Sequence, residues 1–363
     1  MNMWMYIARR VLAFIPTLLL LTILVFMMAW MLPHEYFILP LTAGFLGPTP
    51  HGPSYYYSIM KIYPSDPALT YLYYLEGLFT GNWGITASGF GVNFPFSGSV
   101  FTNIWFFVRI SLVLIVVSAI ISIFVARSLA TYASRNTGSR LQQFLTLFSY
   151  SGFSAPAIWI APLLMLIFGK GIGPYPLGIF PFSGIGINTY SLPSFISPSG
   201  LSSSPTGFII IDALIAGDLP IFFSLLMHMV LPVATISYGL VASLLRFYML
   251  SMDEEKYQEY VKAAKSRGVR ERELFNRHIR RNATIKTMPQ MGVVIANMIL
   301  GLIVAENFFG YYGIGMLLFQ SLLVPYLQIW ALMAIIFILG LIILVSSLLV
   351  DILLAYIDPK IRF

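Results

Sequence analysis

The hydrophobic residues of this chain fall into six long runs, which polar or charged segments separate. A helix needs about 20 mostly apolar residues to cross the hydrocarbon core of a bilayer, and every run reaches that length. The pattern therefore predicts an all-α polytopic membrane protein with spans at Val11–Leu32, Ile104–Val125, Phe144–Phe168, Ile221–Leu245, Met288–Phe309 and Ile329–Tyr356.

The segments between the runs predict how the chain is organised. Residues 33–103 and 170–220 are rich in Gly, Pro, Ser and aromatic residues, which predicts two large extracytoplasmic segments, the first of them an ordered cap. The first run is longer than the apolar part of a signal peptide, which has about 7–15 residues, so we expect it to be retained as a span. The rest of the chain divides into five parts: the cytoplasmic N-terminal end with the first span (1–32), the second and third spans (104–169), the fourth span (221–250), a charged segment (251–286), and the last two spans with the C-terminal tail (287–363).

Composition agrees with a membrane protein. Hydrophobic residues make up 58% of the chain and charged residues 10%, whereas soluble domains carry about 25% charged residues. The chain has no cysteine and four scattered histidines, which excludes disulfides and thiolate metal sites and gives no basis for a histidine metal site. We therefore expect no metal and no catalytic residues.

The positive residues predict the orientation in the membrane. Eighteen Lys and Arg lie on the side that holds both termini, the loop 126–140 and the charged segment. The other side has Lys61 and Lys170, with Arg109 near the mouth of the second span. Because Lys and Arg concentrate in cytoplasmic loops, we expect a multi-pass protein of the cell membrane with both termini cytoplasmic. The net charge of +7 then needs no nucleic acid to explain it.

The charged segment, residues 251–286, holds ten of the 21 Lys and Arg and six of the 14 acids. Ser251 and Glu254 have the spacing of a capping box, which predicts a helix from Ser251 to about Arg267. Gly268 can adopt the left-handed conformation that ends a helix, and a second amphipathic helix follows. A simple solvated loop is the alternative. The order of small residues, glycine and second helix favours a surface on which another protein docks.

This segment resembles the cytoplasmic "EAA" loop of ABC-importer permeases, most closely in the dipeptide/oligopeptide/nickel branch. Within it, the matching positions are Tyr260, Ala263-Ala264, Gly268, His278 and Arg281-Asn282-Ala283. Elsewhere the resemblance rests on Tyr6-Ile7-x-Arg9-Arg10, Gly81-Asn82-Trp83-Gly84, Ser154-x-Pro156-x-x-Trp159, His228-x-x-Leu231-Pro232, Glu306-x-x-Phe309, Gly313-x-Gly315, Leu349-Val350-Asp351 and Asp358-Pro359-Lys360-Ile361-Arg362.

The resemblance implies the fold and the partners. The fold would be that of a type I ABC importer permease, and this chain would form half of the translocation pathway. A homologous second permease, two ATP-binding cassette subunits and an extracytoplasmic solute-binding protein would complete the transporter, within membrane lipid and without nucleic acid. ATP and Mg²⁺ would bind to the partner subunits, so this chain has no cofactor. The residues expected to couple it to the ATPases are Glu259, Tyr260, Ala263, Ala264 and Gly268.

The chain departs from the family pattern at four positions. Lys286 stands where a proline is usual, with Pro289 nearby, so the start of the fifth helix is expected to bend differently. Arg270 replaces a serine that often caps the second helix of the loop, a loss of about 1 kcal/mol that Glu271 and Glu273 partly offset. Tyr312 replaces a proline, and Met249 stands where a second arginine is common.

Each polar residue within the spans has a structural and a functional interpretation. Gln290 and Asn297 lie seven residues apart, hence on one helix face, and are candidates for the translocation path. We expect Glu306 and His228 to make structural hydrogen bonds, Asp351 to pair with an arginine, and Arg109 to reach the outer interface or to serve in a gate. The prolines expected to shape helices, and so to line a cavity, are Pro156 and Pro232.

The function predicted is that of an ABC-importer permease subunit. Peptides are the first substrate class, and oligosaccharides or nickel complexes the alternatives, because the aromatic residues of the outer segments could also stack on sugars. The sequence contains no GxxxxGK[ST] phosphate loop, so any ATP hydrolysis is expected in separate subunits and the chain itself is not an enzyme. A secondary transporter or channel without ATPase partners, and a membrane-anchored scaffold, are the rival classes.

Overall fold

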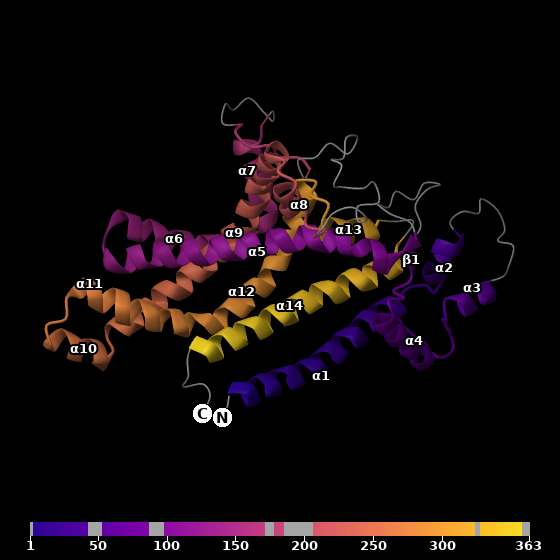
Figure 1. Ribbon diagram of the computed structural model, residues 1–363, viewed down its shortest axis with the longest axis horizontal. Coiled ribbons are helices and arrows are strands. Elements are labelled where there is room, and N and C mark those ends of the chain that lie inside the picture. Colours follow the sequence, from indigo (N-terminus) through magenta and orange to yellow (C-terminus); the bar gives the residue numbers. More distant parts are fainter. Residues whose placement is uncertain are drawn as a thin grey trace.

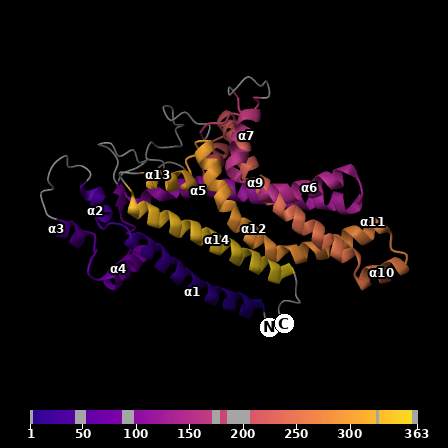
Figure 2. The ribbon, with the colours of Figure 1, turned by 180° about the vertical axis from the view of Figure 1, so that it is seen from behind.

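The computed structural model describes residues 3–42, 53–86, 98–170, 178–184, 206–323 and 327–357. Five helices in this part of the chain are long and apolar enough to cross a membrane: α1 (Met3–Trp30), α5 (Val100–Arg135), α9 (Leu219–Lys256), α12 (Arg280–Phe308) with the turns that precede it, and α14 (Ile329–Ile357). They form an elongated bundle, and the start of α1 lies beside the end of α14 (Figures 1 and 2). The predicted all-α polytopic fold is confirmed.

The third predicted span is two helices instead of one. Helix α6 (Arg140–Ser154) ends before Pro156, and α7 (Ala157–Phe168) leaves in another direction (Figure 1). Proline has no backbone N–H and clashes with the preceding turn, so it ends α6 and starts α7. Helix α7 has 12 residues, about 18 Å of helix, which is shorter than the hydrocarbon core. The expectation of one continuous helix over Phe144–Phe168 was therefore wrong.

Two helices continue well past their apolar runs. Helix α5 extends to Arg135 through most of the predicted loop 126–140, because Ala126, Ala130 and Ala133 are buried and let it pack closely. Helix α9 continues to Lys256, so Ser251 lies inside it and forms no capping box. An end of hydrophobicity marks the edge of the bilayer and does not by itself end a helix.

Helix α9 is the centre of the bundle and packs against α5, α6, α7, α8 (Ile209–Ile215) and α12. Small residues allow these close approaches, as is common between membrane helices. A Cβ on Gly152 would lie 2.7 Å from the Ala242 side chain, and the Ser237 hydroxyl donates to the Ser118 carbonyl on α5 over 3.4 Å. The paired helices α1 and α14 meet in the same way where Leu21 covers Gly340.

The described part of segment 33–103 is ordered, as predicted. It contains α2 (Glu35–Thr42), α3 (Pro53–Ile59), α4 (Pro67–Thr80) and a two-stranded sheet, in which β1 (Ile85–Thr86) pairs antiparallel with β2 (Gly98–Ser99). The Asp66 carboxylate accepts a hydrogen bond from the Leu69 N–H and so caps α4. Aromatic side chains of α1 and α4 pack together, with Phe26 between Trp30 and Tyr74.

Glu306 attaches a short helix, α13 (Ile314–Ser321), to the end of α12. Its carboxylate is fully buried and accepts hydrogen bonds from the Ser111 hydroxyl at 2.5 Å and from the Gly315 N–H at 2.6 Å. The same hydroxyl accepts from the Ile314 N–H at 2.8 Å. A Cβ on Gly313 would lie 2.0 Å from the carboxylate, so only glycine fits there. These are the structural hydrogen bonds expected of Glu306.

The Glu306→Ala substitution should lower stability by about 3 kcal/mol, because it leaves several buried donors without an acceptor at about 1–3 kcal/mol each. Thermal unfolding of the purified chain in detergent measures the loss. Gln290→Ala, at an exposed position of the same helix, is the control and should change stability by less than about 0.5 kcal/mol. Equal melting temperatures for Glu306→Ala and the control would contradict this structural role.

Candidate functional site

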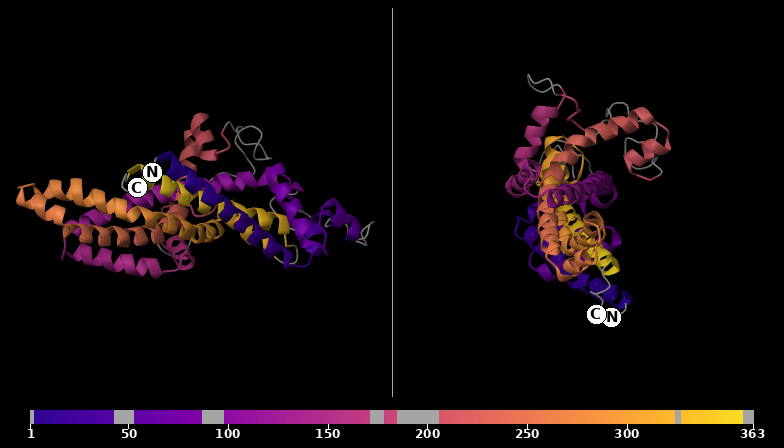
Figure 3. Two further views of the ribbon diagram at one scale, coloured as in Figure 1. Left: turned by 90° about the horizontal axis from the view of Figure 1, so that it is seen from below. Right: turned by 90° about the vertical axis from the view of Figure 1, so that its left-hand side faces the viewer.

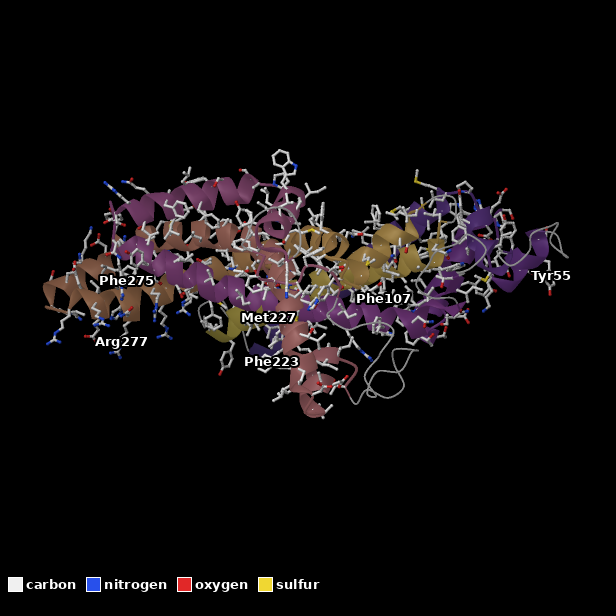
Figure 4. All side chains as sticks on the ribbon, turned by 90° about the horizontal axis from the view of Figure 1, so that it is seen from above. Tyr55, Phe107, Phe223, Met227, Phe275 and Arg277 are labelled. Carbon is white, nitrogen blue, oxygen red and sulfur yellow. The ribbon has the colours of Figure 1, made fainter. Side chains whose placement is uncertain are left out.

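The charged segment forms one extreme end of the bundle (Figure 3, left). After α9 ends at Lys256, the chain turns at Tyr257 and Gln258 and forms α10 (Glu259–Ser266). The single helix expected from Ser251 to Arg267 is thus two helices with a break between them. Glu259 lies in the first turn of α10, where a negative charge is favourable. The labelled Arg277 lies at this end, among many nitrogen-bearing side chains (Figure 4).

Gly268 ends this helix in the predicted left-handed conformation, with a φ of +77°. The Gly268 N–H bonds to the Lys265 carbonyl at 3.0 Å, and the Val269 N–H bonds to the Ala264 carbonyl at 3.2 Å. A Cβ at this position would meet nothing within 4 Å. The glycine is therefore required by its backbone conformation and not by lack of space.

The second helix of the segment runs without interruption into the fifth span. It starts as α11 (Glu271–Glu273), passes through a π-helical turn, η1 (Leu274–Ile279), and continues as α12. Arg270 provides no side-chain cap, and Glu271 and Glu273 occupy the first turn, as predicted. Three side chains of this π turn are buried, namely Leu274, Phe275 and Ile279. The expectation of a separate helix beginning at Met288 was wrong.

The exposed side of α10 is small and polar. The Glu259 side chain is 86% exposed and pairs with Lys262 at 2.8 Å, an exposed pair worth at most about 1 kcal/mol. Ala263 is exposed and Ala264 is half-buried against the core. Val261 is buried and anchors the opposite side of α10. The exposed side of α10 is thus smooth, and one buried apolar side chain holds the helix in place.

A buried carboxylate joins α10 to the two long helices. Glu255, in the last turn of α9, is 3% exposed, and its Oε1 lies 2.6 Å from the Lys286 ammonium on α12. The Tyr260 hydroxyl of α10 donates to its Oε2. Lys286 also lies 3.7 Å from Glu254. We call Glu255, Tyr260 and Lys286 the Glu255 cluster. It connects three separate elements through one side chain.

The charges and hydrogen bonds of the Glu255 cluster support one another. A carboxylate at the C-terminus of a helix is unfavourable, and burial makes it costlier, so Glu255 needs the nearby Lys286 charge. Burial and then the hydrogen bond to Glu255 raise the pKa of Tyr260 to about 12, so its hydroxyl remains a donor at physiological pH. From the sequence, Lys286 was noted only as a departure from the family pattern. Its pairing with Glu255 was missed.

The two candidates for the translocation path share one face of α12, but only one of them lines the neighbouring cavity. Gln290 and Asn297 both lie on the exposed face of α12, in line with the exposed Val293 and Leu300. Asn297 also lines a cavity of about 280 Å³ between α9, α12 and the break between α6 and α7. Polar side chains contribute to the cavity, namely Thr235, Tyr238 and Ser243. Gln290 does not line it.

Other singled-out residues have structural partners. Asp351 pairs with Arg10 at 3.4 Å, and His228 Nδ1 lies 2.8 Å from the Ser224 carbonyl, as expected. The Arg109 guanidinium lies so close to Gly207 that a Cβ there would be 1.9 Å from it. Pro232 is accommodated inside α9 without ending it. The tail motif at 358–362 lies outside the described residues.

Comparison with known proteins identifies the family. The family described as "Binding-protein-dependent transport system inner membrane component" matches residues 120–363. The oligopeptide transport system permease protein AppB of Bacillus subtilis is 25% identical over 359 residues, which cover 99% of both chains.

Two further relatives agree with this assignment. The dipeptide transport system permease protein DppB of Lactococcus lactis is 25% identical over 361 residues, covering 98% of this chain and 99% of the relative. The peptide transport system permease protein SapB of Salmonella typhimurium is 33% identical over 184 residues, covering 50% and 52%. The chain therefore belongs to the inner membrane components of binding-protein-dependent transport systems, which confirms its resemblance to the ABC-importer permeases of the peptide branch.

Proposed function

We propose that this chain forms half of the translocation pathway of an ABC importer and that its charged segment transmits the motion of ATPase subunits to the spans. The Glu255 cluster is the observation that supports this most directly. It connects α10, which has an exposed face for a partner, to both α9 and α12. A force on α10 would thus act on two long helices at once, since neither is interrupted between the cluster and the bundle.

Family membership supports our proposal for the other subunits of the transporter. We expect a homologous second permease, two cytoplasmic ATP-binding cassette subunits that bind ATP and Mg²⁺, and an extracytoplasmic solute-binding protein at the opposite end. The positive residues at the end with the charged segment favour a cytoplasmic location for this end and for both termini. A secondary transporter or channel has no support from the relatives, whose names describe permeases of transport systems.

Peptides are the substrate class that we propose. The relatives that match nearly the whole chain are named as oligopeptide and dipeptide permeases. Oligosaccharides remain the alternative substrate class, because the aromatic residues of the outer segments could stack on sugars. Asn297 is the better candidate for the path, because it lines a cavity beside a helix break, and such breaks in transporters commonly line a pathway. Other polar side chains that contribute to this cavity are those of Thr235, Tyr238 and Ser243.

Affinity purification of this chain from its native membrane tests the assembly. We expect two copies of an ATP-binding cassette subunit, or one of each of two kinds, to be recovered with it, since α10 offers a docking face. Purification without crosslinking and after mild crosslinking distinguishes weak association from none. Recovery of the intact chain without any ATPase subunit in either sample would overturn the proposal.

The Gly268→Pro substitution should uncouple ATP hydrolysis from transport, because proline cannot adopt a φ of +77°. Gly268→Asn is the matched control, since asparagine tolerates the left-handed conformation and the site has room for it. A bulky residue at Ala264 should have the same effect as proline. Transport and ATPase rates of the assembled complex in proteoliposomes are the measurements, and unchanged transport in Gly268→Pro would count against coupling.

The Lys286→Met substitution should loosen α10, because it leaves the buried Glu255 carboxylate unpaired. We expect a loss of roughly 2 kcal/mol, below the 3–5 kcal/mol of fully buried pairs, since the Lys286 side chain is 43% exposed. Hydrogen exchange over residues 251–268 measures the loosening. The double variant Glu255→Met/Lys286→Met should recover most of the protection.

Lys265→Met is the control for this pair. Lys265 is 58% exposed and lies 4.0 Å from Glu271, so its loss should matter little. Equal exchange in Lys286→Met and Lys265→Met would show that the Glu255 cluster does not hold α10.

A further inference from the structure

Three arginines lie close together on α5 and at the start of α12, namely Arg127, Arg135 and Arg280. Arg127 and Arg280 line an open hollow of about 350 Å³, together with Phe124, Ser128 and Thr131. Arg135 lies two turns beyond Arg127 on α5, where its guanidinium stacks 5.0 Å from the Phe275 ring. The family assignment and the proposed coupling leave this hollow without a role.

The positive charges of the hollow are unmatched. Among the described residues, neither Arg127 nor Arg280 has a carboxylate within ion-pair distance, although other basic residues nearby do, such as Arg277 with Glu273 at 3.5 Å. The Nε atoms of Arg127 and Arg280 are buried and lack a hydrogen-bond partner within the described part of the chain. A buried donor without an acceptor is unfavourable. An anion with several oxygens, such as a phosphate, placed in the hollow would neutralise the two guanidinium charges that line it.

The depth of the hollow matches the headgroup region of a bilayer. The apolar run of α5 begins near Ile104, and Arg127 follows 23 residues later, which is about 34 Å along a helix. That is slightly more than the hydrocarbon thickness of about 30 Å. The arginines therefore lie just past the end of the hydrocarbon core.

An exposed apolar stripe leads from the bilayer to the hollow. Val116, Ile120 and Phe124 are exposed by 52%, 50% and 66%, and their spacing of four residues places them on one face of α5. The hydroxyl residues Ser128 and Thr131 and then Arg135 continue on this face. The face thus changes from apolar to hydroxyl-bearing to cationic along its length, which complements the acyl chains, ester groups and anionic phosphate of a phospholipid in that order.

We propose that this hollow binds the phosphate of an anionic phospholipid, whose acyl chains lie along Val116, Ile120 and Phe124. A free phosphate would need no apolar stripe. A zwitterionic lipid would bring its own cation near the arginines, so a lipid with net negative charge fits better. This site is separate from α10 and does not depend on the proposed coupling.

Native mass spectrometry of the full chain, titrated in detergent with phosphatidylglycerol or with phosphatidylcholine, tests the proposal. We expect the first phosphatidylglycerol to bind more tightly than phosphatidylcholine. Arg127→Gln and Arg280→Gln should each weaken phosphatidylglycerol binding about fivefold, the factor for about 1 kcal/mol per basic residue. Unchanged phosphatidylcholine binding shows that a variant is folded, and Arg127→Lys, which keeps the charge, should retain most of the affinity.

Arg277→Gln is the matched control, because it removes one positive charge outside the hollow and should bind phosphatidylglycerol as the wild type does. Equal phosphatidylglycerol affinity in all variants, or the same loss in Arg277→Gln, would overturn the proposal. Displacement of the lipid by millimolar inorganic phosphate would show a small-anion site instead. Bound phosphatidylglycerol in the assembled transporter supports the proposal, and its absence there would assign the hollow to a subunit interface.

Discussion

A bilayer offers the backbone no hydrogen-bond partner, and this constraint shapes every part of the chain that crosses it. Long uninterrupted helices satisfy their own N–H and carbonyl groups, so α5, α9 and α12 extend through and beyond the hydrocarbon core. Where the backbone leaves the helix, a side chain supplies the missing hydrogen-bond partner. Glu306 is such a case, because its buried carboxylate accepts from the first N–H groups of α13.

The Glu255 cluster obeys the same rule for charge. A buried carboxylate must have a partner, and Lys286, 31 residues further along the chain on α12, is that partner. Lys286, which the resemblance marked as a departure from an expected proline, therefore has a structural role in this chain. Two features that look anomalous separately, an acid at a helix C-terminus and a lysine in place of proline, are thus one interaction. Tyr260 extends that interaction to the surface that a partner would touch.

The sequence predicted what depends on composition and local geometry. Apolar runs marked the spans because the bilayer sets their length, and Gly268 was identified because few other residues adopt its backbone conformation. The ends of helices were harder, because α5 and α9 continue on packing that hydropathy does not record. Pro156 was expected to shape its helix, but the length of the run 144–168 led us to assign one span where the structure has two helices. The Glu255–Lys286 pair depends on tertiary structure, and nothing in the order of the residues indicated it.

The continuous helix from Glu271 to Phe308 has an angular consequence as well as a mechanical one. Each residue of an α-helix advances its direction by about 100°, so the number of residues between Gly268 and Asn297 sets which way the exposed face of α12 points relative to α10. One inserted or deleted residue would turn that face about a quarter of a revolution, even with every contact at either end preserved. The π turn at Leu274–Ile279 holds one such extra residue, so the length of the chain here fixes the rotation of the exposed face of α12 relative to α10.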